Sequence, residues 1–281
     1  MNSASAWMAA AAFVLMFFNW GIEARKWQLA LSPVHTITFP VACRAIFTGT
    51  TLAFFTPNRI GEYMGRIMHL EEGKRISSIA LTIVCSLAQL MITITAGIAG
   101  IYFIRDRLEA AEGPRIIFWI NLFLTGVCGV WIVLTIFYFR ISWLMKKIET
   151  IRGIEKYLTY ISVLDRFNAT LLLRILSLSA GRFLIFILQY ALLFSAFGVN
   201  MEWWQTFWSV SVVFLVIAVI PSIALLTELG VRWEASLEVI RLFSPNMAGI
   251  LAASLAVWVI NLVIPALIGS LLIPRLKFFR K

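Results

Sequence analysis

FFTPNRIGEYMGR, residues 54–66, places two arginines, a glutamate and a proline directly after an apolar run long enough to cross a bilayer. Proline lacks a backbone N–H and suits the first position of a helix, so Pro57 predicts that a new helix begins here. In such a helix Glu62 lies one turn from both Arg59 and Arg66, so the three side chains share a face and can pair. The stretch therefore predicts a turn in the chain with a cluster of charges beside it.

The composition of the whole chain explains why these charges are unusual. Of 281 residues, 61% are hydrophobic and 14% are charged, whereas soluble domains are about half apolar and about a quarter charged. Seven apolar runs, each long enough to cross a bilayer as a helix, cover about 5–22, 35–56, 77–104, 116–139, 171–197, 205–226 and 246–273. None alternates at period two, which argues against a β-barrel. The sequence predicts an all-α, polytopic integral membrane protein with a single transmembrane domain over residues 1–281.

A second polar segment, LTELGVRWEASLE at 226–238, shares the features of the first. Each follows an apolar run of about 22 residues, contains a glycine and mixes Arg with Glu. Glu228 and Arg232 are four residues apart and can pair on a helix. The two segments lie about 170 residues apart, which predicts two pseudo-repeats, at about 1–139 and 140–281. The residues expected to shape the two segments are Pro57, Gly61, Pro221 and Gly230.

The distribution of basic residues predicts the topology. If all seven runs cross the membrane, the basic segment 140–170 lies on the opposite side from Arg25 and Lys26. If runs 35–56 and 205–226 instead begin re-entrant hairpins, about five full spans remain, with 14 basic residues on one side and 4 on the other. The positive-inside rule favours this second arrangement, which places the C-terminus in the cytoplasm and makes the hairpins an inverted repeat. A bundle of seven full spans is the alternative.

Charged side chains within or beside the apolar runs are the candidates for a binding site. Arg182 lies about 11 residues inside its run, too deep to reach the interface easily, so we expect it to face inward. A helix that begins at Pro57 would aim free N–H groups inward and, with Arg59, would favour an anion. The predicted lipid- or anion-binding residues are Arg59, Glu62, Arg66, Arg182, Glu228, Arg232 and Glu234. The alternative is that the charges of both polar segments lie in the headgroup zone.

Other features exclude several classes of protein. The net charge is +10, but Lys and Arg flank the spans and no basic run is interleaved with exposed aromatics, so no nucleic-acid partner is expected. The three cysteines and two histidines lie far apart without metal-ligand spacing, so we expect no metal site and no cofactor. Because nucleophile-elbow and Walker motifs are absent, we assign no catalytic residue and expect no enzymatic activity.

Three stretches resemble one known family. TPNRIGEYMGR resembles the P-[GN]-R-x-G-E signature of the flippase-like transmembrane region of lysylphosphatidylglycerol synthases. NWGIEARKW and LTELGVRWEA are similar to two further stretches of that family, although the second lacks the family's double glycine. The resemblance covers residues 18 to 273 and assigns site roles to Arg59, Gly61 and Glu62, and to Gly230, Val231 and Glu234. In NWGIEARKW, the residues Glu23 and Lys26 predict a local ion pair where the first span leaves the membrane.

The resemblance implies lipid handling. We expect a membrane lipid translocase that moves a polar or anionic lipid headgroup between leaflets through a charged cavity, with a phospholipid or other anionic lipid as its partner. The expected location is a bacterial-type cytoplasmic membrane. No polar region of the sequence is large enough for a soluble synthase domain, so the resemblance carries over translocation and not synthesis. The alternatives are a secondary transporter of a small soluble anion, a non-transporting membrane scaffold and a membrane-embedded enzyme.

Overall fold

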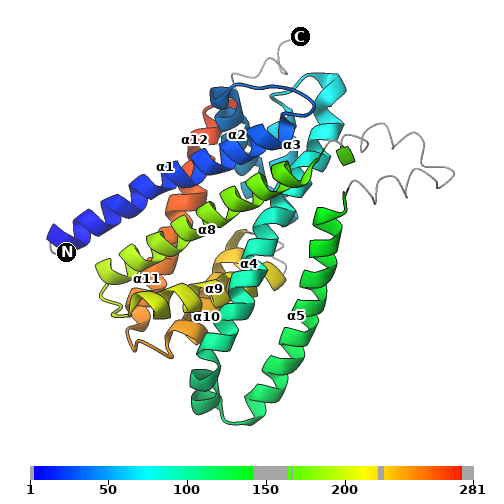
Figure 1. Cartoon of the computed structure of the whole chain (residues 1–281). Coiled ribbons are helices and arrows are strands. Elements are labelled where there is room, and N and C mark those ends of the chain that lie inside the picture. Colours follow the sequence, from blue (N-terminus) through cyan, green and yellow to red (C-terminus); the bar gives the residue numbers. More distant parts are fainter. Residues whose placement is uncertain (1–2, 142–163, 166, 221–224, 274–281) are drawn as a thin grey trace. The chain divides into compact units, whose positions relative to one another are not determined.

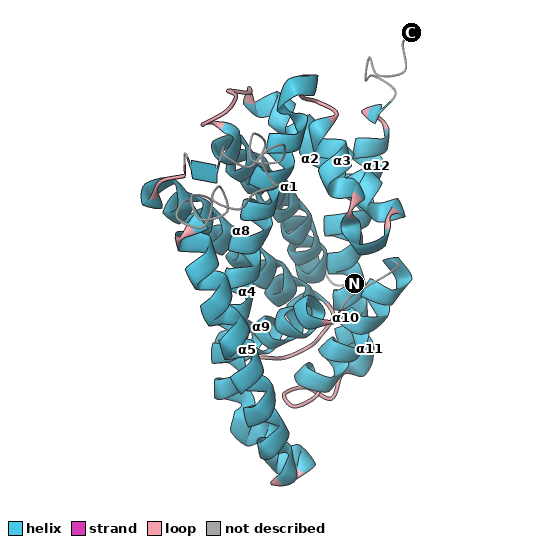
Figure 2. Ribbon diagram, turned by 90° about the vertical axis from the view of Figure 1, so that its right-hand side faces the viewer, coloured by secondary structure: helices cyan, strands magenta, loops and turns pink. Residues whose placement is uncertain are grey.

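The structure of the chain is a computed structural model that describes residues 3–141, 164–165, 167–220 and 225–273. Within these ranges the secondary structure is helical and no strand occurs, which confirms the predicted all-α class (Figure 2). The elements are α1 (Ser3–Leu31), α2 (Phe39–Phe55), η1 (Pro57–Arg59), α3 (Gly61–Ile67), η2 (Glu72–Lys74), α4 (Arg75–Glu112), α5 (Arg115–Phe139), α8 (Ala169–Ala196), α9 (Trp203–Val219), α10 (Leu225–Ile240), α11 (Met247–Trp258), the π-helical η4 (Val259–Val263) and α12 (Ile264–Ser270).

Five helical stretches are long and apolar enough to cross a membrane, namely α1, α4, α5, α8 and the continuous run Met247–Ser270. The other two apolar helices, α2 and α9, are shorter, with 17 residues each. At about 1.5 Å per residue, a helix of this length falls short of the roughly 30 Å hydrocarbon core. The polytopic architecture is therefore confirmed, and a re-entrant course for the two shorter helices stays a prediction.

The chain divides into two compact units, each assembled from three segments. Unit 1 comprises Met1–Asn19, Ile92–Ile132 and Phe183–Val263, and unit 2 comprises Trp20–Met91, Val133–Arg182 and Ile264–Lys281. Each unit contains one of the short apolar helices, α9 in unit 1 and α2 in unit 2. The units do not follow the two halves of the sequence, and the pseudo-repeats stay a prediction.

Unit 2 is organised around α2, which packs against α3 on one side and α12 on another (Figures 1 and 2). Glycines make both contacts close. A Cβ atom on Gly65 of α3 would lie 2.5 Å from the Cα of Gly49 on α2, so neither position has room for a side chain. Thr51 of α2 donates a hydrogen bond of 2.7 Å to the carbonyl of Ala266 on α12. Because polar groups lack water partners in a membrane, such bonds within the protein hold helices together.

Unit 1 is organised around α9, which packs against α10 and against the C-terminal part of α4. A Cβ atom on Gly100 of α4 would lie 2.7 Å from the carbonyl oxygen of Trp208, so the two backbones approach closely. Phe103 of α4 stacks on the Trp208 ring with 4.4 Å between centroids. Asn246 caps α11 by accepting a 2.9 Å hydrogen bond from the N–H of Gly249. Small residues and aromatic stacking thus make the helix contacts of this unit, as is usual in membranes.

Candidate functional site

Glu23, on α1, lies at the centre of a buried network of ion pairs in unit 2. Its carboxylate oxygen Oε2 lies 2.7 Å from Nζ of Lys26 and 2.9 Å from Nη1 of Arg182. Its other oxygen, Oε1, lies 3.0 Å from Nη2 of Arg66. One carboxylate therefore accepts from three cations, which α1, α3 and α8 contribute. Such an arrangement keeps charged groups paired where water is scarce.

The network continues along α3 toward the surface. Nη2 of Arg66 also donates to Oε1 of Glu62, and Nε of Arg59 lies 3.7 Å from Oε2 of the same residue. Side-chain exposure rises along this path, from 2% for Arg66 to 22% for Glu62 and 44% for Arg59. We call Glu23, Lys26, Arg59, Glu62, Arg66 and Arg182 the unit 2 cluster. Four cations and two carboxylates give it a formal charge of +2.

The local fold explains how α3 presents these groups. Pro57 opens η1 as predicted, at a position that needs no backbone N–H. Arg59 then has φ +57°, in the left-handed region that residues with a Cβ rarely adopt. The chain turns there, and Gly61 begins α3 with its N–H donating a 2.7 Å hydrogen bond to Oγ1 of Thr56. The turn places Arg59, Glu62 and Arg66 on one path, as their spacing predicts.

The second polar segment forms a smaller site in unit 1. Nη2 of Arg232 lies 3.1 Å from Oε1 of Glu228, and its Nη1 donates to the hydroxyl of Tyr190 at 3.3 Å. The predicted pairing within α10 is therefore present, and one cation balances one carboxylate. Glu234 lies on an exposed face of the same helix. Gly230 is also exposed, with open space where a Cβ would lie. The remaining predicted position, Pro221, lies outside the described residues.

The comparison with known families decides what this architecture is. The family model for the lysylphosphatidylglycerol synthase TM region matches residues 1–269. The chain belongs to this family. A search of curated proteins gives no match. The resemblance inferred from the three sequence stretches is thereby confirmed, and the chain is an integral membrane protein related to lipid modification or transport.

In this family member, the central position of Glu23 is the feature that sequence reasoning missed. The predicted local pair with Lys26 exists, but Arg66 and Arg182 bind the same carboxylate. The expected run ended at residue 22, whereas α1 continues to Leu31, so Glu23 lies within the helix and is 3% exposed. Three charged residues inside a long apolar helix, followed by further helical residues, were the available signal.

A chain of buried amides in unit 1 was also not predicted. Asn19 donates to Oδ1 of Asn261 at 2.7 Å, and Asn261 donates to Oε1 of Gln189 at 3.0 Å. Gln189 in turn donates to the carbonyl of Ala12 at 2.9 Å. Asn261 lies in the π-helical η4, where a local change of helix pitch re-aims side chains. The sequence signal was single amides within apolar runs, which is too common in membrane helices to identify partners.

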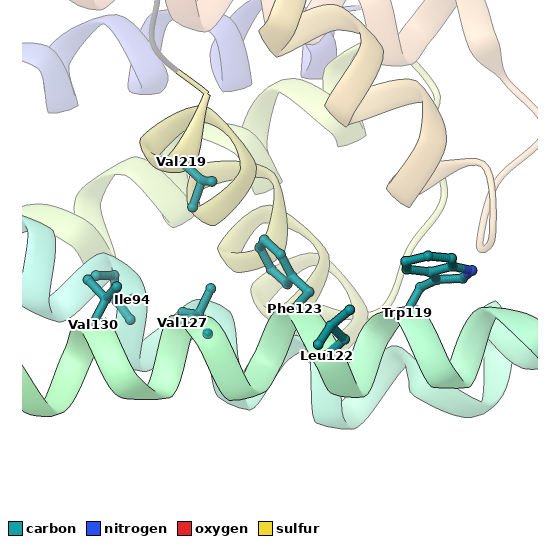
Figure 3. A pocket seen from close by; sticks show the side chains of 8 residues that line it. Ile94, Trp119, Leu122, Phe123, Val127, Val130 and Val219 are labelled. Atoms are coloured by element: carbon teal, nitrogen blue, oxygen red, sulfur yellow. The ribbon is translucent and has the colours of Figure 1, made fainter.

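A groove of about 520 Å³ lies in unit 1, lined by apolar residues of α4, α5 and α9 (Figure 3). Trp119 and Phe123 of α5 and Val219 of α9 belong to its wall. The lining residues that the structure describes carry no charge, so the groove is chemically distinct from both charged sites. Among the described residues, no group of His, Cys, Asp and Glu side chains could hold a metal ion.

Proposed function

We propose that this family member is a lipid translocase that moves a polar headgroup between the leaflets of a bacterial-type cytoplasmic membrane. The observation that carries the proposal is the unit 2 cluster. Charges inside a membrane protein are costly and are retained where they line the path of a polar or charged substrate. Six ionisable side chains joined by ion pairs, in a family named for a lipid synthase, fit the passage of a lipid headgroup.

The graded exposure of the cluster suggests the order of events. Arg59, the most exposed member, would meet the headgroup first and release Glu62 from their 3.7 Å pairing. Arg66 would follow, while Glu23 keeps the inner cations paired when no substrate is bound. The acyl tails would stay in apolar surroundings throughout. We assign translocation and not synthesis to this chain, because the matched region is the transmembrane part of the family.

The order of elements supports the proposed duplicated unit. Long helix α1 precedes the 17-residue α2, the short α3 and long α4, and long α8 precedes the 17-residue α9, then α10 and α11. The 14-to-4 bias of basic residues supports two re-entrant hairpins and a cytoplasmic C-terminus. In this arrangement the Glu228–Arg232 pair is the counterpart of Glu62–Arg66.

Reconstitution into vesicles with fluorescent lipids tests the function directly. Arg59→Ala is expected to lower the translocation rate by about tenfold to a hundredfold, since a charge-assisted hydrogen bond contributes roughly 1.5–3 kcal/mol. The fold should persist, because Arg59 is 44% exposed. The control is Arg241→Gln, which removes an exposed arginine that pairs with Glu112 and Glu238 on the surface of unit 1.

Two results would reject the proposal. The first is a wild-type rate equal to that of empty vesicles for several anionic lipids, with and without a proton gradient. The second is uptake of a soluble anion that is independent of lipid composition, which would identify a solute transporter. A wild-type translocation rate after both Arg59 and Glu62 are neutralised would instead show that the unit 2 cluster is not on the path of the lipid.

The apolar groove supports a lipid over a soluble substrate, and it gives a second prediction. Gly126 lines the groove and has open space at its Cβ position, so Gly126→Leu would place a side chain in part of the groove. We expect several-fold slower lipid translocation, because the added side chain competes with an acyl chain for apolar contact. The matched control is Gly129→Leu, at an equally open glycine one turn further along α5 that does not line the groove. Equal rates for the two variants would show that the groove plays no part.

A further inference from the structure

We propose that the apolar groove of unit 1 holds one acyl chain of a phospholipid from the leaflet on the side of the α4–α5 turn, and that Arg115 binds the phosphate of the same lipid. The inference rests on the proposed translocase function, to which it adds a position for the lipid in one leaflet. Three observations carry it: the length of the groove, its volume, and the basic side chain beyond one of its ends.

The groove follows one face of α5 over the depth of a single leaflet. Its α5 residues recur at helical spacing from Trp119 to Val130, so they line one side of the helix. Figure 3 shows Trp119 at one end of this line and Val130 at the other. At about 1.5 Å per residue the line is about 16 Å long, and half of a roughly 30 Å hydrocarbon core is about 15 Å. An acyl chain that begins at Trp119 would therefore end near the middle of the bilayer.

The volume of the groove favours a narrow occupant. A helix that is about 10 Å across and about 16 Å long occupies about 1,200 Å³, more than twice the 520 Å³ of the groove. A helix of a second protein therefore does not fit into it, whereas this volume lies within the usual range of pockets for small ligands. The lining side chains that the structure describes are apolar, and Val127 among them is only 8% exposed. A single hydrocarbon chain matches this lining, because it needs no hydrogen bonds.

The third observation is the exposed Arg115, the first residue of α5. It precedes Trp119 by four residues, so it lies one turn beyond the groove on the same face of the helix. Within the described part of the chain Arg115 forms no ion pair, and the neighbouring Glu112 is bound to Arg241 at 3.2 Å. A guanidinium matches the geometry of a phosphate, and tryptophan is enriched where headgroups meet the hydrocarbon. The Trp119 end of the groove therefore suits the end of the lipid that carries the phosphate.

This polarity determines which leaflet supplies the lipid. The phosphate end of the groove is at the α4–α5 turn, and its apolar end is at Val130. In the proposed topology, with the C-terminus in the cytoplasm, this turn lies on the opposite side of the membrane, so the groove belongs to the outer leaflet. A lipid from the other leaflet would bring its terminal methyl group, and not its phosphate, toward Arg115.

Photolabelling of the full chain in vesicles tests the inference. The probe is phosphatidylglycerol with a diazirine in one acyl chain, either near the ester or near the terminal methyl, and mass spectrometry identifies the labelled residues. We expect the ester-end probe to label Trp119 and the methyl-end probe to label Val127 and Val130. Lipid that only surrounds the protein would instead label Phe118 and Ile132, which are 65% and 52% exposed on another face of α5. Stronger labelling of these two residues than of Val127, or the reverse order of depths, would overturn the proposal.

Two pairs of variants locate the chain and the phosphate. Gly126→Leu should lower labelling of Val127 several-fold, because its side chain takes part of the groove, whereas Gly129→Leu should not. Arg115→Gln should lower labelling about fivefold, the contribution of one basic residue to the attraction of an anionic lipid at the membrane surface. Its control is Arg241→Gln, at an exposed arginine that already pairs with two carboxylates. Wild-type labelling of Gly126→Leu would reject the position of the chain, and wild-type labelling of Arg115→Gln would reject the phosphate contact.

The translocation assay separates this inference from the translocase function. The expected labelling without translocation of any lipid would reject the function and leave the groove as a lipid site. Translocation by the wild type, with labelling spread evenly over the exposed residues of α5, would leave the function standing and reject the groove.

Discussion

Replacing Glu23 with glutamine is expected to destabilise the folded protein by about 3–5 kcal/mol, the usual effect of removing one partner from a buried ion pair. The amide keeps the shape of the side chain but removes the charge that Lys26, Arg66 and Arg182 share. Lys26 and Arg66 are 1% and 2% exposed, so they cannot find water instead. The melting temperature in detergent, with the yield of monodisperse protein, measures the effect.

A second substitution distinguishes the loss of charge balance from the loss of packing. Lys26→Met retains an unbranched apolar stem but removes one of the cations that Glu23→Gln leaves without a carboxylate partner. The double variant Glu23→Gln/Lys26→Met should therefore be less destabilised than the sum of the two single variants, because residues in one network do not act additively. The control Glu72→Gln alters a carboxylate that is 87% exposed and pairs with Arg75 at 3.5 Å. It should change stability by about 0–1 kcal/mol. A similarly small effect at Glu23 would contradict the buried cluster.

The contrast between Glu62 and Glu23 shows what the sequence could predict. Glu62 and Arg66 are four residues apart, and helical periodicity alone brings them together. Glu23 is 43 residues from Arg66 and 159 from Arg182, so only the packing of three helices joins them. Hydrophobic length predicted seven apolar segments, because the bilayer sets that length directly, but it did not predict that α2 and α9 have only 17 residues each. Contacts between helices depend on side-chain fit, which leaves no periodic signal in one sequence.

The glycines of the two polar segments also show the limit of prediction from sequence, because their surroundings in the structure differ. Gly61 and Gly230 have equivalent places in the sequence, and both are expected to shape a hairpin. In the structure, a Cβ atom on Gly61 would overlap the backbone of Leu52 and lie 2.7 Å from Oγ1 of Thr56. A Cβ atom on Gly230 would meet nothing within 4 Å. Gly61 therefore lies where no side chain fits, and Gly230 lies in open space, while a role for either glycine in shaping a hairpin stays a prediction.

This difference predicts opposite effects for one substitution at the two sites. Gly61→Ala should destabilise the protein by about 1–3 kcal/mol or more, because the new methyl group forces α3 away from α2. Gly230→Ala should leave stability unchanged or raise it by up to about 1 kcal/mol, since alanine is the better residue within a helix. The melting temperatures of the two purified variants give the comparison, and Gly65→Ala, which meets the backbone of Gly49, should behave as Gly61→Ala does.

The same two variants connect the hairpin to the proposed function. Glu62 and the buried Arg66 both lie on α3. Separating α3 from α2 should therefore also move these two side chains away from Glu23. Gly61→Ala is therefore expected to lose lipid translocation together with stability, whereas Gly230→Ala should retain both. If Gly61→Ala melted at the wild-type temperature, the close α2–α3 packing would be wrong. If it melted lower but translocated lipid at the wild-type rate, the cluster would hold the fold together without contacting the substrate.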